Sequence, residues 1–368
     1  MQNNFSVDKT YAIIVLGDKM DTKLFKIDPK NMDMQVLKET GEIIKKGGLV
    51  AFPTETVYGL GGDALNKESS KKIYAAKGRP SDNPLIVHIC SIEDLEAIVK
   101  NVPIEARQLA DKFWPGPLTM IFEKSDKVPF ETTGGLSTVA VRMPKDEIAL
   151  EFIRQSGGYV AAPSANISGK PSPTLAKYVM EDMDGRIDAV IDGGEAIIGL
   201  ESTILDLTEK VPMILRPGYV TKEMLLEVLK EVSEDSTILE KPEGIKPKAP
   251  GMKYRHYAPK GQLTVVAGEK MNVIDKINQL TEEAMRKGLK TGVIATGENY
   301  GLYKADVVKN AGDRNDEAAI AKELYRILRE FDDEDVEVIC SESFDAEGIG
   351  QAIMNRLLKA AGHHIEYV

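Results

Sequence analysis

The stretch FPTETVYGLGGDA, residues 52–64, joins the end of an apolar run to a glycine-rich segment. The run itself, residues 48–53, is short, apolar and bounded by glycine and proline, which predicts a β-strand. Hydroxyl groups and a carboxylate at a strand end can hydrogen-bond a small polar ligand, and glycines let the backbone approach it. The same residues also suit a β-turn capped by a threonine hydroxyl. The stretch therefore predicts either a ligand-contacting strand end or a capped turn.

On either side of this stretch, residues 10–235 alternate β-rich runs with helical stretches, which is typical of an α/β domain. The predicted strands are 48–53, 84–89, 118–123, 138–142, 159–162, 189–192, 202–207 and 213–215. The predicted helices are 32–46, 67–77, 103–113, 145–156, 174–181 and 221–231. Several strands follow one another in the middle of this region, so we expect a mixed, twisted sheet.

A second pattern begins near residue 260. Predicted strands at 262–267, 291–296, 306–309 and 336–340 are separated by predicted helices at 271–288, 315–330 and 347–361. Strands separated by such helices indicate a smaller, Rossmann-like parallel α/β unit. We predict a first domain at 1–235, a linker at 236–258 rich in proline and glycine, and a second domain at 259–368. Residues 241–260 hold six basic residues and one acidic residue.

The composition limits the class of protein. The chain has 368 residues and a formal net charge of −11, which argues against a general nucleic-acid coat protein, since that class is basic. Two cysteines exclude a disulfide scaffold and a cysteine-built zinc site, and they suit a reducing cytoplasm. No apolar run reaches the ~18 residues of a membrane span, and the first residues lack the pattern of a signal peptide. We expect a cytoplasmic protein and assign no metal ligands.

Cations stand where helices and strands are predicted to end. Lys77 and Arg79, two residues apart after a predicted helix, can both point at one polyphosphate. Two solvated cations near a helix C-terminus are the alternative interpretation. Arg142 ends the strand 138–142, where it can hold a carboxylate or form a structural salt bridge. Arg216 follows the strand 213–215 in the same way.

Polar residues also gather at strand ends, which is where ligands usually bind in α/β sheets. Ser164 and Asn166 lie on a loop after the strand 159–162, and the alternative for this loop is a helix N-cap. The chain has neither a Walker A loop nor a G-x-G-x-x-G motif after a strand, and no Ser-His-Asp set is apparent. His88 lies within an apolar strand, where a histidine is usually a core residue. An enzyme built this way must obtain most of its rate from binding and positioning.

Six segments occur in this order: FPTETVYGLGGDA (52–64), KGRPSDNPLIVHI (77–89), WPGPLT (114–119), VAVRMP (139–144), APSANISG (162–169) and ESTILD (201–206). Together they closely resemble the YrdC-like threonylcarbamoyl-AMP synthase family, over about residues 30–235. The segment PGMKYRHYAPK (250–260) and the α/β region after it look like the long, two-domain form. The resemblance implies a nucleotidyltransferase that makes L-threonylcarbamoyladenylate from L-threonine, bicarbonate or CO2, and ATP, releasing pyrophosphate. The product would serve threonylcarbamoyl-adenosine modification of tRNA beside the anticodon.

The resemblance also implies two half-sites. Threonine would be held by Thr56, His88, Arg142, Ala162 and Ser202. ATP would be held by Arg79, Asn83, Thr138, Ser164, Asn166, Ser172, Arg216 and Tyr257. Lys77 would lie near the phosphates and the bicarbonate, so that Lys77 and Arg79 carry the catalytic role. Magnesium would accompany ATP, and the downstream tRNA threonylcarbamoyl transferase machinery would be the partner.

The basic linker offers a lid, because its prolines favour extended backbone that can cross the mouth of a pocket. Two rival hypotheses stay open. The first is a non-catalytic module that binds double-stranded RNA or tRNA, which the linker permits and the net charge of −11 disfavours. The second is another carbamoyl transfer, as in hydrogenase-maturation proteins that carry YrdC-like domains. Those proteins also carry zinc fingers, for which two cysteines leave no room.

Overall fold

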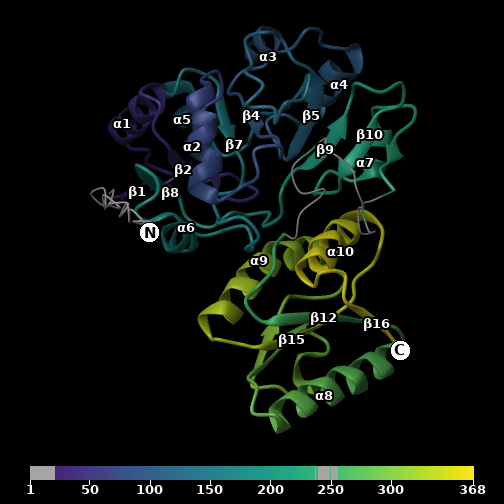
Figure 1. Cartoon of the computed structure of the whole chain (residues 1–368). Coiled ribbons are helices and arrows are strands. Elements are labelled where there is room, and N and C mark those ends of the chain that lie inside the picture. The colour runs from purple at the N-terminus through teal and green to yellow at the C-terminus, as the bar shows by residue number, and fades with distance from the viewer. Residues whose placement is uncertain (1–20, 237, 239–248, 250–255) are drawn as a thin grey trace, which may run out of the picture.

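The computed structural model describes residues 21–236, 238, 249 and 256–368. Figure 1 shows two bodies, an N-terminal domain built on a large sheet and a C-terminal domain built on a smaller one. Most of the predicted linker, and with it most of the predicted lid, lies outside the described residues. Ala249, His256 and Tyr257 of the linker are described, and all three are buried.

The N-terminal sheet is mixed, as predicted, and has eleven strands. Their order is β1 (Lys23–Lys26), β8 (Ala189–Asp192), β2 (Val50–Phe52), β3 (Gly59–Asp63), β7 (Val160–Ala162), β4 (Ile86–His88), β6 (Thr138–Arg142), β5 (Leu118–Glu123), β9 (Thr203–Asp206), β10 (Met213–Arg216) and β11 (Ser233–Glu234). Antiparallel pairs such as β2–β3 and β5–β6 alternate with parallel pairs such as β4–β6 and β5–β9. Strands from distant parts of the chain therefore meet at the centre of the sheet.

The helices of this domain are α1 (Met34–Lys45), α2 (Lys67–Lys77), α3 (Glu93–Ile98), α4 (Ile104–Phe113), α5 (Glu147–Gln155), α6 (Ala176–Met183) and α7 (Lys222–Leu226). Side chains cap the N-termini of some of these helices: Asn66 accepts from Glu68 N at α2, and Asp146 accepts from Ala149 N at α5. Helix α2 ends at Gly78, which has φ 62° and a left-handed conformation that suits glycine. The backbone N–H of Arg79 then donates to the Tyr74 carbonyl at 2.9 Å.

Several elements differ from the prediction. The glycine-rich run 59–63, interpreted as a turn or ligand loop, is the strand β3. Small residues are required here, because a Cβ on Gly61 would lie 2.9 Å from a methyl group of Val160 on the neighbouring strand β7. The short elements β1, β11 and α3 were not predicted, and α7 is shorter than the predicted 221–231. A strand of alternating glycines lacks the β-branched signal from which strands are predicted.

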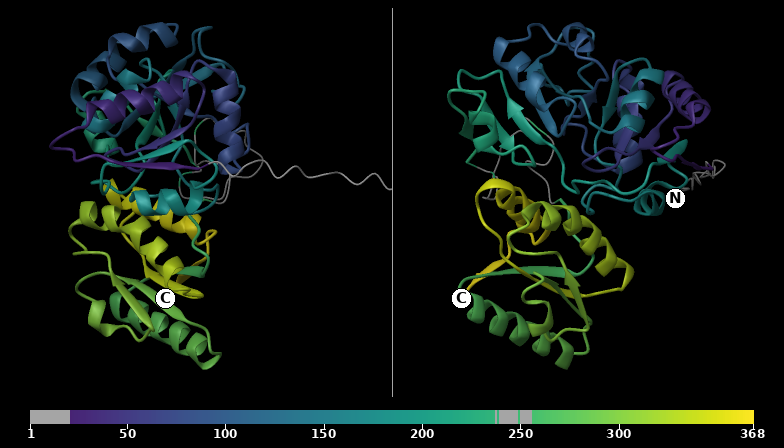
Figure 2. Two further views of the ribbon diagram at one scale, coloured as in Figure 1. Left: turned by 90° about the vertical axis from the view of Figure 1, so that its left-hand side faces the viewer. Right: turned by 180° about the vertical axis from the view of Figure 1, so that it is seen from behind.

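The C-terminal sheet is fully parallel, in the order β14 (Val307–Asn310), β13 (Thr291–Ala295), β15 (Val338–Glu342), β12 (Gln262–Ala267) and β16 (Ile365–Tyr367). Helix α8 (Lys270–Arg286) covers one face. Helices α9 (Glu317–Asp333) and α10 (Gly348–Ala360) cover the other face and point toward the N-terminal domain (Figure 2). A short 3-10 helix, η1 (Tyr300–Leu302), follows β13, and strand β16 was not predicted. The Rossmann-like architecture is confirmed.

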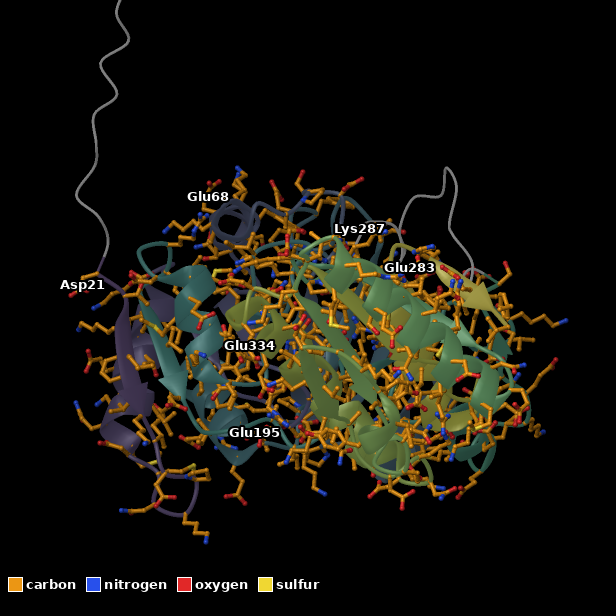
Figure 3. The ribbon with its side chains drawn as sticks, turned by 90° about the horizontal axis from the view of Figure 1, so that it is seen from below. Asp21, Glu68, Glu195, Glu283, Lys287 and Glu334 are labelled. Carbon is orange, nitrogen blue, oxygen red and sulfur yellow. The ribbon has the colours of Figure 1, made fainter. Side chains whose placement is uncertain are left out.

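Buried contacts join the two domains. Val57 and Leu200 of the N-terminal domain belong to one hydrophobic cluster with Tyr257 and the inner faces of α9 and α10. Arg329 of α9 forms a buried ion pair of 2.7 Å with Asp182 of α6. At the rim of the interface, Glu195 lies 3.5 Å from Lys322 of α9 (Figure 3 labels Glu195). A continuous apolar core with buried ionic contacts fixes how the domains pack.

Candidate active site

Strand pairing brings one row of polar side chains together on the N-terminal sheet. In this row His88 of β4 is paired with Arg142 of β6, which is paired with Thr119 of β5. Side chains directly opposite one another point to the same face of a sheet. The Thr119 hydroxyl lies 2.7 Å from the hydroxyl of Ser202, which precedes β9. Ala162 ends β7 on the other side of β4. Ala162 lines one cavity together with His88, Arg142, Ser202 and the nearby Thr56.

Residues 54–57, within the stretch FPTETVYGLGGDA, form the turn beside this row. The Thr54 hydroxyl accepts from the backbone N–H groups of Thr56 and Val57 and donates to the Val57 carbonyl. This is a threonine-capped turn. Thr56 and Val57 also line the cavity. The capped-turn alternative is therefore confirmed, and the turn places the hydroxyls of Thr54 and Thr56 in the cavity wall, while contact with a ligand stays a prediction.

Arg142 is buried and fixed at the floor of this cavity. Its Nη1 donates to the Thr56 hydroxyl at 2.8 Å, and its Nε donates to the Gly116 carbonyl at 3.2 Å. Its Nη2 lies 2.7 Å from a carboxylate oxygen of Glu55, so Arg142 also forms the structural ion pair that was the alternative interpretation. Burial and the neighbouring charge of Arg142 lower the pKa of His88 to about 3. His88 is therefore a neutral imidazole beside a guanidinium group.

Two further guanidinium groups face the cavity, and backbone carbonyls position both of them. Arg79 donates from Nε to the Asn83 carbonyl at 3.2 Å and from Nη2 to the Pro84 carbonyl at 3.0 Å. Arg216 donates to the carbonyl of Ser202 at 3.0 Å and to its hydroxyl at 3.1 Å. Burial lowers the pKa of Arg79 to about 10, which leaves it charged at neutral pH. The cavity thus has three arginines and one carboxylate, Glu201, in its wall.

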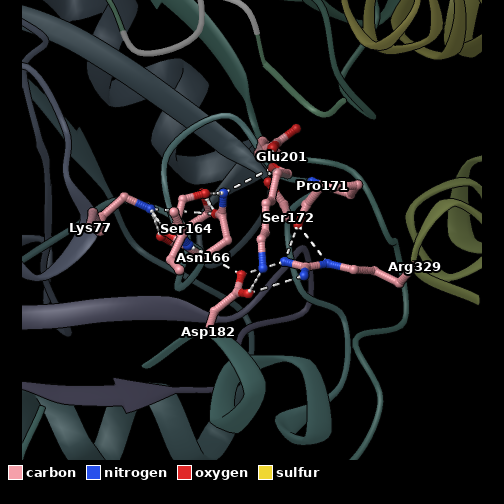
Figure 4. Close-up of polar contacts among 10 residues, drawn as sticks. Lys77, Ser164, Asn166, Pro171, Ser172, Asp182, Glu201 and Arg329 are labelled. Atoms are coloured by element: carbon pink, nitrogen blue, oxygen red, sulfur yellow. Dashed lines mark hydrogen bonds and ion pairs between the residues drawn. The ribbon is translucent and has the colours of Figure 1, made fainter. Parts of the chain in front are cut away.

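Lys77 does not line this cavity. Its ammonium group is buried and donates to the backbone carbonyls of Ser164 and Asn166, the second at 2.5 Å (Figure 4). The Ser164 hydroxyl donates to Asn166 Oδ1 at 2.6 Å, and the Asn166 amide closes the loop onto the carbonyls of Ile167 and Lys170. Lys77 is therefore neither a solvated cation nor a wall residue. It organises the loop that presents Ser164 to the cavity.

Glu201 connects the cavity to the C-terminal domain. It accepts from the Ser172 hydroxyl at 2.6 Å, from the Tyr325 hydroxyl at 2.8 Å and from Arg356 Nε at 3.1 Å. Burial alone would raise the pKa of this carboxyl, but the charges of Arg356 and Arg216 and the Ser172 hydrogen bond lower it to about 2. Glu201 is thus ionised. Its partners Tyr325 and Arg356 come from α9 and α10.

His256 and Tyr257 close the cavity from the side of the linker. Tyr257 has φ 65°, and its ring packs 5.2 Å from that of Tyr325. Burial, with the charge of Arg79 second, lowers the pKa of His256 to about 3. The free volume of the cavity is about 60 Å³, far below the ~300–1,000 Å³ of ordinary small-molecule sites. The enclosed part of the cavity therefore has room for only a few waters.

The chain was compared with known proteins. Residues 42–218 match a family model described as "Telomere recombination", and residues 220–362 match one described as "Threonylcarbamoyl-AMP synthase, C-terminal domain". The threonylcarbamoyl-AMP synthase of Pyrococcus abyssi is 51% identical over 322 residues, 88% of this chain and 93% of its own. The Bacillus subtilis synthase is 47% identical over 330 residues, 89% of this chain and 94% of its own.

The chain belongs to the threonylcarbamoyl-AMP synthase family. It has the long, two-domain form of the family, as predicted. The crystal structure of P. abyssi Sua5 complexed with L-threonine superimposes with a TM-score of 0.90 at 48% identity, covering 94% of this chain and all of that one. Membership in a family of enzymes favours catalysis over the non-catalytic RNA-binding hypothesis.

Of the site residues that the family resemblance implied, some line the cavity and others do not. Those in the wall are Thr56, Arg79, His88, Arg142, Ala162, Ser164, Ser202, Arg216 and Tyr257. Those outside the wall are Lys77, Asn83, Thr138, Asn166 and Ser172. Sequence reasoning gave no role to the buried groups Tyr325 and Arg356. It treated Glu55 and Glu201 only as members of motifs and His256 only as part of the linker that offers a lid. Tyr325 and Arg356 each lie more than 120 residues from Glu201 along the chain, so no local sequence pattern connects them to it.

The structure describes residues 21–236, 238, 249 and 256–368 of the chain. No group of three or more His, Cys, Asp or Glu side chains in this part of the chain could hold a metal ion. No helix within it is both long enough and apolar enough to cross a membrane.

Proposed function

We propose that this protein catalyses formation of L-threonylcarbamoyladenylate from L-threonine, bicarbonate or CO2, and ATP, with release of pyrophosphate. The observation that carries this proposal is the charge of the cavity wall: three buried arginines against one wall carboxylate, Glu201, with Glu55 outside the wall paired to Arg142, in a protein of net charge −11. Such a wall favours anionic ligands. Threonine and ATP each bring anionic groups, which suits a wall with cations at more than one place.

The threonine half of the site would use Arg142 for the carboxylate. Its guanidinium fork is rigid because Thr56, Gly116 and Glu55 already hold it. The hydroxyls of Thr56 and Ser202 and the neutral His88 would contact the polar groups of the amino acid. Ala162 leaves room for a methyl group. The P. abyssi Sua5 structure complexed with L-threonine supports this choice of substrate.

The ATP half would use Arg79 and Arg216 for the phosphates, with Ser164 and Tyr257 beside them in the wall. Asn83, Asn166 and Ser172 would act one step back: Asn83 and Asn166 support Arg79 and Ser164, and Ser172 contacts Glu201. Thr138, at the start of β6, would reach ATP only at the edge of the site. Magnesium would enter with the triphosphate, because both oxygens of Glu201 are already taken by Ser172, Tyr325 and Arg356.

The reaction needs no protein nucleophile. The amine of threonine combines with CO2 to give a carbamate, and a carbamate oxygen then attacks the α-phosphorus of ATP. The bond from the α-phosphorus to the bridging oxygen breaks, and its electron pair leaves with pyrophosphate. Arg79 and Arg216 would stabilise the charge that moves onto the leaving group. Lys77 would contribute by holding the Ser164 loop in place.

A carbamate is labile in water, so the site should be closed when it forms. His256 and Tyr257, which already close the cavity, would admit the substrates by moving and then exclude water. The product would pass to the tRNA threonylcarbamoyl transferase machinery. Direct contact with tRNA or other double-stranded RNA would rest on the basic linker, and such binding would weaken steeply with salt.

The test is to incubate the protein with ATP, bicarbonate and each amino acid in turn. Pyrophosphate is assayed, and the adenylate is sought by mass spectrometry. We expect pyrophosphate and a threonylcarbamoyl adenylate with threonine, less with serine, and almost none with valine, which leaves polar groups unpaired. Pyrophosphate release that is indifferent to threonine would refute the proposal.

A further inference from the structure

A second pocket lies in the C-terminal domain, away from the cavity just described. Its volume is about 370 Å³, within the ordinary range of small-molecule sites. Its wall is made by Gly268, Lys270, Val273, Glu298, Asn299, Arg314, Asn315, Glu342 and Ser343. Gly268 follows β12, Lys270 and Val273 lie in the first turn of α8, Glu298 and Asn299 follow β13, and Glu342 and Ser343 lie at the end of β15. Arg314 and Asn315 come from a loop. The pocket is therefore at the carboxyl edge of the parallel sheet.

This edge is where open α/β sheets bind ligands, at the point where neighbouring connections leave for opposite faces. That condition is met between β12 and β15, which are adjacent strands. Helix α8 follows β12 onto one face, and α10 follows β15 onto the other (Figure 1). The topology thus opens a crevice between these two strands, and the pocket occupies it.

A buried polar network forms the floor of the pocket. Glu342 is 1% exposed, and its carboxylate accepts from Thr296 N and from Asn299 Nδ2, each at 3.0 Å. Arg314 forms an ion pair with the same carboxylate from the rim. Since Nδ2 of Asn299 donates to Glu342, its Oδ1 must be an acceptor that faces elsewhere. Asn299 is 4% exposed, and its Oδ1 has no well-aligned hydrogen bond within the described residues, while the buried Tyr303 hydroxyl interacts with the same side chain.

The charges around the pocket are balanced. Lys270 and Arg314 are the cations, and Glu298 and Glu342 are the carboxylates. Lys270 is exposed at the first position of α8 and forms no ion pair with any residue that the structure describes. Glu298 accepts from the backbone N–H of Arg314 at 3.0 Å, which folds the loop over the pocket. A pocket with both signs suits a ligand with both signs.

A nucleotide does not suit this pocket, although the domain is Rossmann-like. The side chain of Glu269 caps the N-terminus of α8 by accepting from Met271 N at 3.2 Å, so a carboxylate stands where a phosphate would bind. The sequence after β12 has no glycine-rich phosphate loop. Apart from Gly268, Val273 is the single apolar residue of the pocket wall. The wall has no aromatic ring on which a base could stack.

We propose that this pocket binds a small zwitterion, a free α-amino acid. The ammonium group would donate to Asn299 Oδ1 and approach Glu298, and the carboxylate would pair with Lys270. The buried acceptor then gains a well-aligned donor, and the unpaired cation gains an anion. This site is separate from the synthase cavity and does not depend on the function proposed for it.

The experiment is calorimetric titration of the full-length protein with the common L-amino acids. For each that binds, the primary amine and the carboxylic acid that lack its other charge are titrated too, along with ATP and inorganic phosphate. The titrations are repeated with Arg142→Lys in the synthase cavity, Lys270→Met in this pocket, and Lys287→Met at the far end of the same helix (Figure 3). Hydrogen exchange of residues 296–299 and 342–343 reports where the ligand binds.

We expect at least one amino acid to bind more tightly than about 1 mM, and its amine and acid analogues at least ~10-fold more weakly. Lys270→Met should weaken binding at this pocket at least ~10-fold, and Lys287→Met should not change it. Arg142→Lys should remove only the threonine that binds in the synthase cavity, so the protection at this pocket should persist in that variant. Protection should appear at 296–299 and 342–343. Binding of no amino acid at millimolar concentration, loss in Arg142→Lys of the protection at 296–299 and 342–343, or preference for phosphate or ATP at this pocket would overturn the proposal. The adenylate assay is independent, so failure there would refute only the synthase function.

Discussion

Arg356 of α10 donates from Nε to the Glu201 carboxylate at 3.1 Å, and both side chains are buried. This ion pair joins the C-terminal domain to a residue in the wall of the synthase cavity. Arg356 also donates to the backbone carbonyls of Pro217 and Glu201. The C-terminal domain therefore holds the chain on both sides of β9 and β10, from which Ser202 and Arg216 reach the cavity.

Replacing Arg356 should destabilise the protein strongly. In Arg356→Met the Glu201 carboxylate stays buried without its cation, which costs about 3–5 kcal/mol. The quantity to measure is the free energy of unfolding from urea titration followed by fluorescence. Arg286→Met, at the exposed end of α8, is the matched control and should stay within about 0.5 kcal/mol of the wild type. Equal effects in the two variants would show that the ion pair contributes nothing special.

Tyr325→Phe separates the hydrogen bond to Glu201 from ring packing. The variant loses a hydrogen bond of 2.8 Å to a charged acceptor but keeps the ring that packs on Tyr257. We expect a loss of stability of about 1.5–3 kcal/mol, with a rise in KM for ATP because Glu201 and Ser172 lose a fixed position. Tyr300→Phe, on an exposed tyrosine, should change neither quantity. Unchanged KM and stability in Tyr325→Phe would contradict this role.

Two buried histidines make the protein sensitive to mild acid. The pKa of His88 and that of His256 are both lowered to about 3, from an ordinary value of 6.5. Below pH 6.5 the unfolded chain binds protons that the folded chain refuses, so stability is complete above pH 6.5 and falls as the pH drops from 6.5 toward 3. The slope should approach about 1.4 kcal/mol per pH unit for each histidine.

The measurement is the free energy of unfolding at several pH values from about 7.5 to about 5, where the two histidines of the unfolded chain take up protons. The two buried histidines should contribute about equally to this slope, so His88→Gln should remove about half of their joint contribution. His364→Gln, at an exposed position, should keep the full slope. A slope that His88→Gln leaves unchanged would show that burial of His88 does not govern acid sensitivity.

Lys77→Met tests whether Lys77 positions a loop or takes part in the chemistry. The variant leaves the carbonyls of Ser164 and Asn166 buried without a donor, at a cost of about 1–3 kcal/mol each. We expect lower stability and a raised KM for ATP, with a smaller effect on kcat. Lys71→Met, on the exposed side of the same helix, is the control. A large loss of kcat with KM and stability intact would instead place the ammonium group at the reacting atoms.

Arg142→Lys and Arg216→Lys should separate the two substrates. Lysine keeps the charge but lacks the planar fork, so each variant loses bidentate binding of one anion. Arg142→Lys should raise KM for threonine about 10–100-fold and KM for ATP little, and Arg216→Lys should do the reverse. Steady-state kinetics with each substrate varied in turn provides the comparison. The same pattern in both variants would contradict the assignment of half-sites.

The sequence predicted the α/β class, the mixed first sheet and the parallel second sheet because hydrophobic periodicity and turn residues are local signals. It also identified nine residues of the cavity wall, through motifs that stand at strand ends. It missed β3, because a strand rich in glycine has no propensity signal. The position of β3 depends on close packing of its glycines against the side chains of Phe52 and Val160, which the sequence does not reveal. It assigned Lys77 to the phosphates, which stays a prediction. It did not foresee that the ammonium group donates to the loop carbonyls of Ser164 and Asn166.

The sequence by itself thus determined which elements form and which polar side chains stand at their ends. Only the tertiary structure decided which of them meet. Glu55 and Arg142, or Glu201, Tyr325 and Arg356, are far apart in sequence, and their pairing depends on strand order and on how α9 and α10 dock. The physical reason is that a buried charge needs a partner, whereas the chain alone does not say which distant partner the fold will bring to it.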